Sequence, residues 1–178
     1  EVKVTLPDLP EGLEGLTIVQ LSDVHVGQTL GRPFVEHLVQ RVNALAPDLI
    51  AITGDLVDGE VAKLQDDLAP IFNLHAPLGV FFITGNHELI SGVDSSVEHI
   101  RSGGITVLEN NAVQLQRHGA TMNLVGVEDW ESARFHRGRA ANLDAALAGC
   151  DTALTTLLLA HQPKAVDEAS LRGGDLQL

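Results

Sequence analysis

Three short polar motifs combine metal-ligand residue types, and each directly follows an apolar run. They are Asp23-Val24-His25, Gly54-Asp55-Leu56-Val57-Asp58 and Gly85-Asn86-His87-Glu88, and a fourth apolar run ends at His161. Carboxylate oxygens, amide oxygens and imidazole nitrogens are ligands for hard and borderline divalent ions such as Mn, Fe and Zn. The motifs therefore predict a metal site.

The spacing within the motifs suggests a role for each candidate ligand. Asp23 and His25 are two residues apart, and at a strand end this spacing can aim both side chains at one ion. Asp55 follows a glycine that permits a sharp turn, so we expect its carboxylate to bridge two ions. Asn86 would add an amide oxygen without adding negative charge, and His161 would complete part of the second ion's shell.

Each motif taken alone has an ordinary structural explanation. Gly-Asp after a strand is commonly a turn, and Gly-Asn-His fits a turn with a left-handed Asn. A lone histidine such as His161 is commonly a hydrogen-bonded residue at a strand end. The metal interpretation depends on the motifs occurring together, at the ends of successive strands.

The first half of the chain alternates apolar runs with helix-like segments. Strands are predicted over residues 17–21, 49–53 and 80–84, and helices from Pro33, over 61–74 with an interruption at Pro70, and over 94–102. Unbroken apolar strands separated by helices indicate a parallel sheet covered on both faces. Ligands bind beyond the carboxyl ends of such strands, so the three motifs should meet at one edge.

The second half of the chain has shorter strands separated by turn signals. Strands over residues 106–108, 112–115 and 122–127 are predicted to pair antiparallel. They are followed by a helix around 143–147, a buried strand over 155–160, a helix over 163–169 and a last strand from Leu176. The chain therefore belongs to the α/β class, with a change of character near its middle.

In their order along the chain, the motifs resemble the calcineurin-like metallophosphoesterase superfamily. The family pattern is Asp-x-His, Gly-Asp-x-x-Asp, Gly-Asn-His-Asp/Glu, a lone His and Gly-His-x-His, and four of these five blocks lie between Asp23 and His161. The resemblance implies one domain over residues 1–178 with an α/β/β/α sandwich, in which a parallel or mixed sheet packs on a second, largely antiparallel sheet. The segment Leu159-Ala160-His161-Gln162-Pro163-Lys164 resembles the branch of transmembrane proteins that carry a metallophosphoesterase domain.

The resemblance also implies which residues bind each of two divalent ions and which residues act on the substrate. One ion would take Asp23, His25 and Asp55, and the other would take Asp55, Asn86 and His161. His87 would contact the substrate phosphate and protonate the leaving oxygen, with Glu88 orienting it, while Asp58 would hold a ligand in place or be a solvated loop carboxylate. The implied reaction is hydrolysis by in-line attack on phosphorus, with a hydroxide that bridges the two metals as nucleophile.

The resemblance leads to a separate expectation for each end of the sequence. The fifth family block, Gly-His-x-His, is expected just beyond Leu178, so the domain would be truncated at its C-terminus and each ion would lack one histidine. The branch resemblance implies a membrane anchor before Glu1. Without such an anchor a cytoplasmic location is expected.

The composition limits the partners of the chain. A net charge of −13 disfavours sequence-independent nucleic-acid binding, and aromatic residues at 3% leave no stacking platform for bases. A phosphoester substrate is compatible with this acidity when divalent cations compensate its charge. The one cysteine, Cys150, excludes a disulfide within the chain.

One position bears on the substrate class. The protein-phosphatase branch of the family has Gly-Asp-x-Val-Asp-Arg-Gly, whereas Gly59 stands here in the place of that Arg. The Arg would grip a phosphomonoester dianion, so its loss favours a phosphodiester or a lipid-type pyrophosphate. A phosphomonoesterase, including a protein phosphatase, and a non-catalytic binding module on the same scaffold stay open as alternatives.

Overall fold

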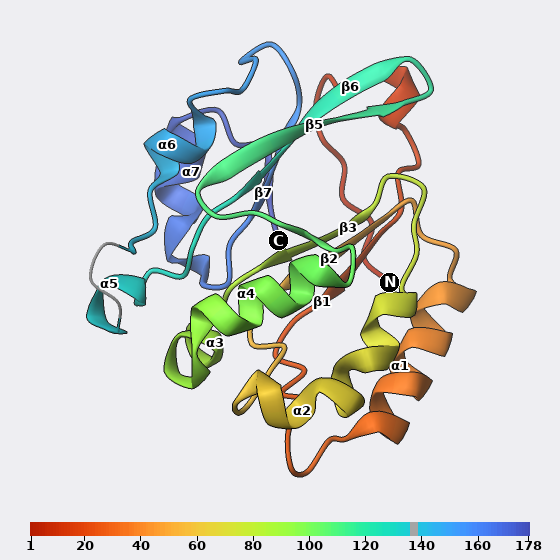
Figure 1. The fold of residues 1–178 in the computed structure, drawn as a ribbon. Coiled ribbons are helices and arrows are strands. Elements are labelled where there is room, and N and C mark those ends of the chain that lie inside the picture. Colours follow the sequence, from red (N-terminus) through yellow and green to blue (C-terminus); the bar gives the residue numbers. More distant parts are fainter. Residues whose placement is uncertain (136–138) are drawn as a thin grey trace.

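The computed structural model describes residues 1–135 and 139–178, which form two four-stranded sheets stacked between layers of helices (Figure 1). The first sheet has the strand order β1 (Ile18–Leu21), β2 (Leu49–Thr53), β3 (Val80–Ile83) and β4 (Thr106–Val107). The segments between these strands form α1 (Arg32–Ala44), α2 (Val61–Leu68), η2 (Ala69–Asn73), α3 (Asn86–Ser91) and α4 (Val93–Ser102), and η1 (Glu11–Leu13) precedes them.

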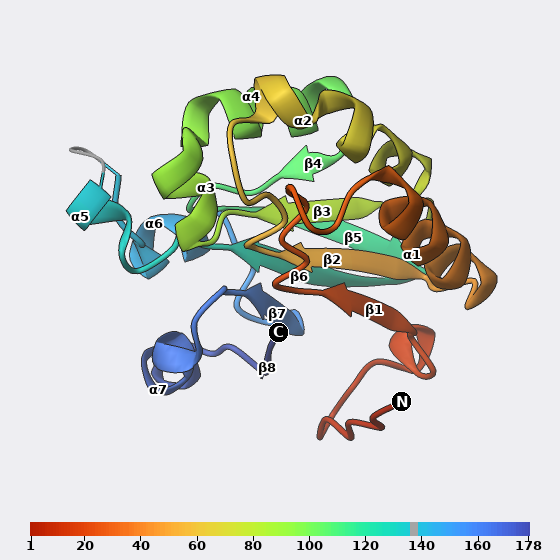
Figure 2. The same ribbon diagram turned by 90° about the horizontal axis from the view of Figure 1, so that it is seen from below.

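The strands of the first sheet are all parallel, and their order in the sheet is their order in the chain. Crossovers between parallel strands are right-handed, so an unreversed order places the connecting helices on the same face of the sheet. Figure 2 shows α1, α2 and α4 together on that face. The opposite face therefore needs a cover from elsewhere in the chain.

That cover is the second sheet, which has the strand order β5 (Asn111–Arg117), β6 (Ala120–Gly126), β7 (Thr156–Leu159) and β8 (Leu176–Gln177). The β5–β6 pair is an antiparallel hairpin, whereas the β6–β7 and β7–β8 pairs are parallel. The remaining helices are α5 (Ser132–Phe135), α6 (Leu143–Leu147), η3 (Pro163–Ala165) and α7 (Val166–Leu171). Residues of α6 and α7 pack on the outer face of this sheet.

Strand β2 shows how one fully buried strand serves two layers. Ile50 and Ile52 pack with the residues of the first helix layer, whereas Leu49 and Ala51 pack with residues of the second sheet. Successive side chains of a strand point to opposite faces, so an unbroken apolar run is required where both faces are covered. Because both faces of the strand are packed, the end of the strand and the polar motif that follows it are held in place.

The predicted α/β fold with two sheets is confirmed, and two details differ from the predictions. The antiparallel pairing predicted for residues 106–108 is wrong, because the α3–α4 crossover returns the chain in the same direction and β4 pairs parallel with β3. The second sheet is mixed, because the long connection through α5 and α6 brings β7 back parallel to β6. As the predicted α/β/β/α sandwich requires, helices cover one face of the first sheet and the second sheet covers the other.

No helix in the described part of the chain combines the length and apolar composition needed to cross a bilayer. Cys150 is partly buried against the cluster between the second sheet and its helices. Burial raises the pKa of the Cys150 thiol, which favours its protonated form. These properties suit a packing role for this residue.

Candidate metal centre

The three polar motifs follow β1, β2 and β3 at the same edge of the first sheet. Beyond the strand ends, the segments after β1 and β2 stay paired: the His25 N–H donates to the Asp55 carbonyl at 3.0 Å, and the Val26 N–H donates to the Leu56 carbonyl at 2.8 Å. This pairing sets two candidate ligand segments side by side. It explains locally why Asp23, His25 and Asp55 meet.

The backbone at these ligands is held in a sparsely populated conformation. Asp23, His25 and Asp55 have φ angles of 54°, 52° and 52°, in the left-handed region that non-glycine residues seldom adopt. Each such residue costs on the order of 1–3 kcal/mol, and backbone strain of this kind concentrates at functional sites. The same three residues form one of the clusters whose ligand atoms lie close together.

Asp55 lies at the centre of the cluster. Its carboxylate is 4% exposed, and its Oδ2 is 3.8 Å from His25 Nε2 and 3.5 Å from His161 Nε2. Ligand atoms of Asp23, His25 and Asp55 lie within 4.8 Å of one another, with Asp23 on the open side at 58% exposed. One carboxylate oxygen between two imidazole nitrogens is the arrangement expected of a ligand shared by two ions.

His161 reaches the cluster from the end of β7 in the second sheet. Its Nδ1 lies 2.9 Å from the Thr53 carbonyl oxygen, an acceptor, so the Nδ1–H donates there. The neutral ring then presents an unprotonated Nε2, which lies 3.2 Å from Asn86 Oδ1. The residue thus enters the site with its tautomer and ring plane already fixed.

The donor set fits a divalent cation. Lone pairs of His161 Nε2, Asn86 Oδ1 and Asp55 Oδ2 converge on one region, as do those of His25, Asp23 and Asp55 on the other side of Asp55. Electron-rich atoms held this close repel one another unless a positive charge lies between them. Imidazole nitrogen with carboxylate and amide oxygen suits Mn, Fe or Zn.

Gly54 permits the close approach of the strand ends. It has a φ of 93°, and a Cβ there would lie 2.7 Å from the Gly85 nitrogen and 2.8 Å from His161 Nδ1. Any larger residue would push apart the segments that carry Asp55, Asn86 and His161. The glycine before Asp55 therefore serves a packing role as well as a turn.

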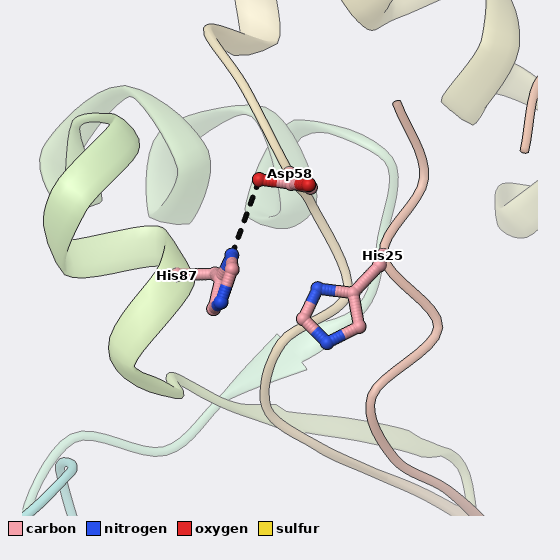
Figure 3. Close-up of side chains that lie close together, drawn as sticks. All are labelled: His25, Asp58 and His87. Atoms are coloured by element: carbon pink, nitrogen blue, oxygen red, sulfur yellow. Dashed lines mark hydrogen bonds and ion pairs between the residues drawn. The ribbon is translucent and has the colours of Figure 1, made fainter. Parts of the chain in front are cut away.

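His87 stands beside the candidate ligands, in the first turn of α3. Its Nδ1 is 3.1 Å from Asp58 Oδ1, and its ring meets the His25 ring edge-on at a centroid distance of 4.4 Å. Figure 3 shows the His87 ring facing Asp58 and His25, which lie on two loops across from α3. His87 Nε2 is 4.0 Å from Asp55 Oδ2, so the ring nitrogen distal to Asp58 faces the cluster.

Glu88 does not orient His87, and that prediction is wrong. Its buried carboxylate accepts the N–H groups of Asp55 at 3.0 Å, Val57 at 3.0 Å and Gly85 at 2.8 Å. Side chains of consecutive residues in the first turn of a helix point in different directions, and Glu88 points into the protein. The carboxylate partner of His87 is Asp58.

Glu88 instead ties together the segments that follow β2 and β3. Burial and the nearby Asp55 charge raise the pKa of the Glu88 carboxyl, against the opposing effect of the three backbone N–H groups. Three donors for one buried carboxylate satisfy a group that would otherwise be costly to bury. Glu88 is therefore a structural support of the site.

Sequence reasoning missed two pairings, and the structure describes only part of the basic loop that carries Arg134, His136, Arg137 and Arg139. The Asp58–His87 bond and the Asp129 carboxylate, buried and bonded to Gln162 Nε2 at 3.0 Å, have no signal in the local sequence. In the basic loop, Arg139 is bound to the carboxylates of Asp94, Glu109 and Glu128, which leaves it little freedom to grip a substrate. His136 and Arg137 of that loop lie outside the described residues.

Residues 16–175 match the family model described as calcineurin-like phosphoesterase. The chain belongs to this family. It is therefore a phosphoesterase-type enzyme domain, and the resemblance on which the candidate ligands rest is confirmed at the level of the family. The match covers the strands from β1 to β7 and every candidate site residue.

Three known proteins illustrate the relationship. A Danio rerio protein named "Transmembrane protein with metallophosphoesterase domain" is 36% identical over 183 residues, covering 100% of this chain and 42% of that protein. The UDP-2,3-diacylglucosamine pyrophosphatase LpxG of Chlamydia trachomatis is 33% identical over 93 residues, covering 52% of this chain and 28% of that protein. The crystal structure of a phosphopantetheinyl hydrolase from Mycobacterium tuberculosis superposes with a TM-score of 0.53 at 15% identity, covering 86% and 71% of the two chains.

These three similarities support conclusions of different scope. The phosphoesterase domain spans less than half the length of the Danio rerio relative. The likeness to the solved hydrolase, at 15% identity, supports the fold alone. Metal-dependent phosphoester hydrolysis is the activity common to the family and compatible with the His and Asp clusters of this chain.

Proposed function

We propose that the protein is a phosphodiesterase whose two divalent ions are held by Asp23, His25 and Asp55 on one side and by Asp55, Asn86 and His161 on the other. The observation that supports this most directly is Asp55 Oδ2, which lies 3.8 Å from one imidazole nitrogen and 3.5 Å from another. When bound, such ions activate water as Lewis acids and compensate the phosphate charge. Mn, Fe and Zn all suit this donor set.

In this proposal His87 supplies the proton to the leaving oxygen. Its Nε2 side faces the cluster, while Asp58 Oδ1, 3.1 Å from Nδ1, keeps the ring in place. After donation from Nε2 the ring stays hydrogen bonded to Asp58 through Nδ1–H. Asp58 therefore acts through His87 and does not contact the reacting atoms.

The preference for a diester rests on charge around the site. Ion pairs of the candidate site residues in the described chain join histidines to carboxylates, without a lysine or arginine. Gly59, in the place of the phosphatase-branch Arg, has a φ of 142°, a conformation in which a side chain is strained. A phosphomonoester dianion needs more positive charge than a diester monoanion, so the site suits the diester better.

Hydrolysis of two chromogenic esters tests the assignment. Metal-stripped intact protein, supplied in turn with Mn²⁺, Fe²⁺ or Zn²⁺, should release p-nitrophenol from bis(p-nitrophenyl) phosphate faster than from p-nitrophenyl phosphate. Faster cleavage of the monoester would identify a phosphomonoesterase instead. A metal-loaded protein inert to both esters would be a binding module on this scaffold.

The intact protein is also proposed to sit at a membrane. The Danio rerio relative carries "transmembrane" in its name, and the domain spans 42% of that protein. Cell fractionation with and without detergent tests this. Recovery of the intact protein in the soluble fraction without detergent would contradict it.

A further inference from the structure

A cleft opens directly beside the candidate metal centre. It has a volume of about 570 Å³ and is lined by His25, Gly27, Gln28, Thr29, Leu30 and Asp58. His25 belongs to the ligand cluster, and Asp58 is bonded to His87. The cleft is thus continuous with the site, and a group inside it lies next to a phosphate held there.

The wall of the cleft is a turn held by main-chain bonds. The Gly27 N–H donates to the Leu30 carbonyl at 3.2 Å, and the Asp58 N–H donates to the Val26 carbonyl at 2.9 Å. Val26 and Val57 also form a parallel bridge behind the turn. Gln28 and Thr29 at its tip are exposed, so their side chains are available to a ligand.

The lining disfavours anionic groups and offers no phenyl or indole ring for stacking. It has no lysine, arginine, phenylalanine or tryptophan, and it includes the Asp58 carboxylate. The guanidinium of Arg32, just beyond the turn, is bound to Glu36 Oε1 at 2.8 Å and to the Asp66 carbonyl at 2.9 Å. An anionic group would meet a carboxylate without a cation, and a nucleobase would find no indole or phenyl ring on which to stack.

The same lining suits a hydroxyl-rich neutral group. The Gln28 amide and the Thr29 hydroxyl each donate and accept hydrogen bonds. The cleft volume falls within the range of about 300–1,000 Å³ typical of small-molecule sites, so it has room for a group in addition to the phosphate.

We propose that this cleft binds an uncharged, hydroxyl-bearing group esterified to the substrate phosphate, of the glycerol or sugar type, and that Gln28 and Thr29 determine specificity for it. The inference rests on the proposed function, because the group must be attached to a phosphate at the metal centre. It adds the substrate class and two specificity-determining residues.

The test compares p-nitrophenyl phosphodiesters that differ only in the second ester group: glycerol, ethyl, choline or thymidine. With intact Mn²⁺-loaded protein, kcat/KM for the glycerol diester should exceed that for the ethyl diester about tenfold, the effect of one or two hydrogen bonds. In the double variant Gln28→Ala/Thr29→Ala the ratio should fall to about one. Gln65→Ala, an exposed glutamine on α2, is the matched control and should keep the ratio.

A ratio near one in the unmodified protein, or a ratio that survives the double substitution, would overturn the proposal. A preference for the choline or thymidine ester would overturn it too, because charge or stacking would then decide binding. Calorimetric binding of glycerol phosphate and ethyl phosphate to the Mn²⁺-loaded protein gives a readout without turnover. If no diester is cleaved, the proposed function fails, but the binding measurement still tests the cleft. Tighter binding of glycerol phosphate than of ethyl phosphate, lost in the double variant, would support the proposed role of the cleft. Equal binding of the two phosphates would reject that role.

Discussion

The two sheets contribute to the candidate metal centre in different ways. The first sheet supplies Asp23, His25, Asp55 and Asn86 from the ends of three successive strands, whereas the second supplies His161 alone among the predicted ligands. The first-sheet segments are braced by paired backbone and by the Glu88 carboxylate. His161 is held by one bond to the Thr53 carbonyl, which belongs to the other sheet.

This difference reflects strand direction. Parallel strands in chain order bring their carboxyl ends to one edge, so every strand end can add a residue to the same site. In the second sheet the β5–β6 hairpin reverses direction, and its two strands end at opposite edges. A site between two sheets is thus built mainly by the parallel one, with the mixed sheet adding single residues at the contact.

The largest expected effect follows from removing the shared carboxylate of the first sheet. Asp55→Asn should lower kcat/KM at least about 1,000-fold and reduce binding of both ions, because one oxygen serves both half-sites. Steady-state kinetics and metal analysis of the purified protein measure the two effects. Asp66→Asn, an exposed control on α2, should change neither, and near-normal metal content in Asp55→Asn would reject the bridging role.

Removing the second-sheet ligand should affect only half of the centre. His161→Ala is expected to lower bound metal from two ions to one and kcat/KM about 100-fold, since one charge-stabilising partner is lost. Metal analysis decides between one and two lost ions, and His37→Ala on the exposed side of α1 is the control. Loss of both ions would show that the ligands from the two sheets do not bind their ions independently.

Glu88→Gln tests the brace of the first sheet. The new amide group cannot accept all three backbone N–H groups, so at least one buried donor loses its partner, at a cost of about 1–3 kcal/mol in the free energy of unfolding. Urea unfolding followed by circular dichroism measures the loss, and Glu98→Gln, exposed on α4, should leave the midpoint in place. An unchanged midpoint in Glu88→Gln would argue against the bracing role.

The smallest effect is expected at Asp58, which acts through His87. Asp58→Asn should lower kcat about tenfold with metal content unchanged, because an amide stabilises the protonated imidazole less than a carboxylate does. The loss should be larger for a diester with a poor leaving alcohol than for one releasing p-nitrophenol, which needs little protonation. The same loss on both diesters would contradict the positioning role, and Asp167→Asn is the exposed control.

The strands and helices of the first sheet could be predicted closely because β2 and β3 are apolar runs bounded by glycine and proline. The break at Pro70, for example, appears as the change from α2 to the 3-10 helix η2. The partner of β4 could not be predicted, because two residues carry no signal for strand direction. The crossover through α3 and α4 decides it.

The sequence by itself determined the residue types of the centre and their order, since carboxylate, amide and imidazole groups after apolar strands define a donor set before any folding is considered. Only the tertiary structure decided which carboxylate serves which partner. Glu88 follows His87 directly in the chain, yet it faces the interior and binds three backbone N–H groups, while Asp58 reaches His87 from another loop. Residues that are adjacent in the chain are also adjacent along a helix. The partner of each side chain, however, depends on the direction in which it points and on the residues packed around it.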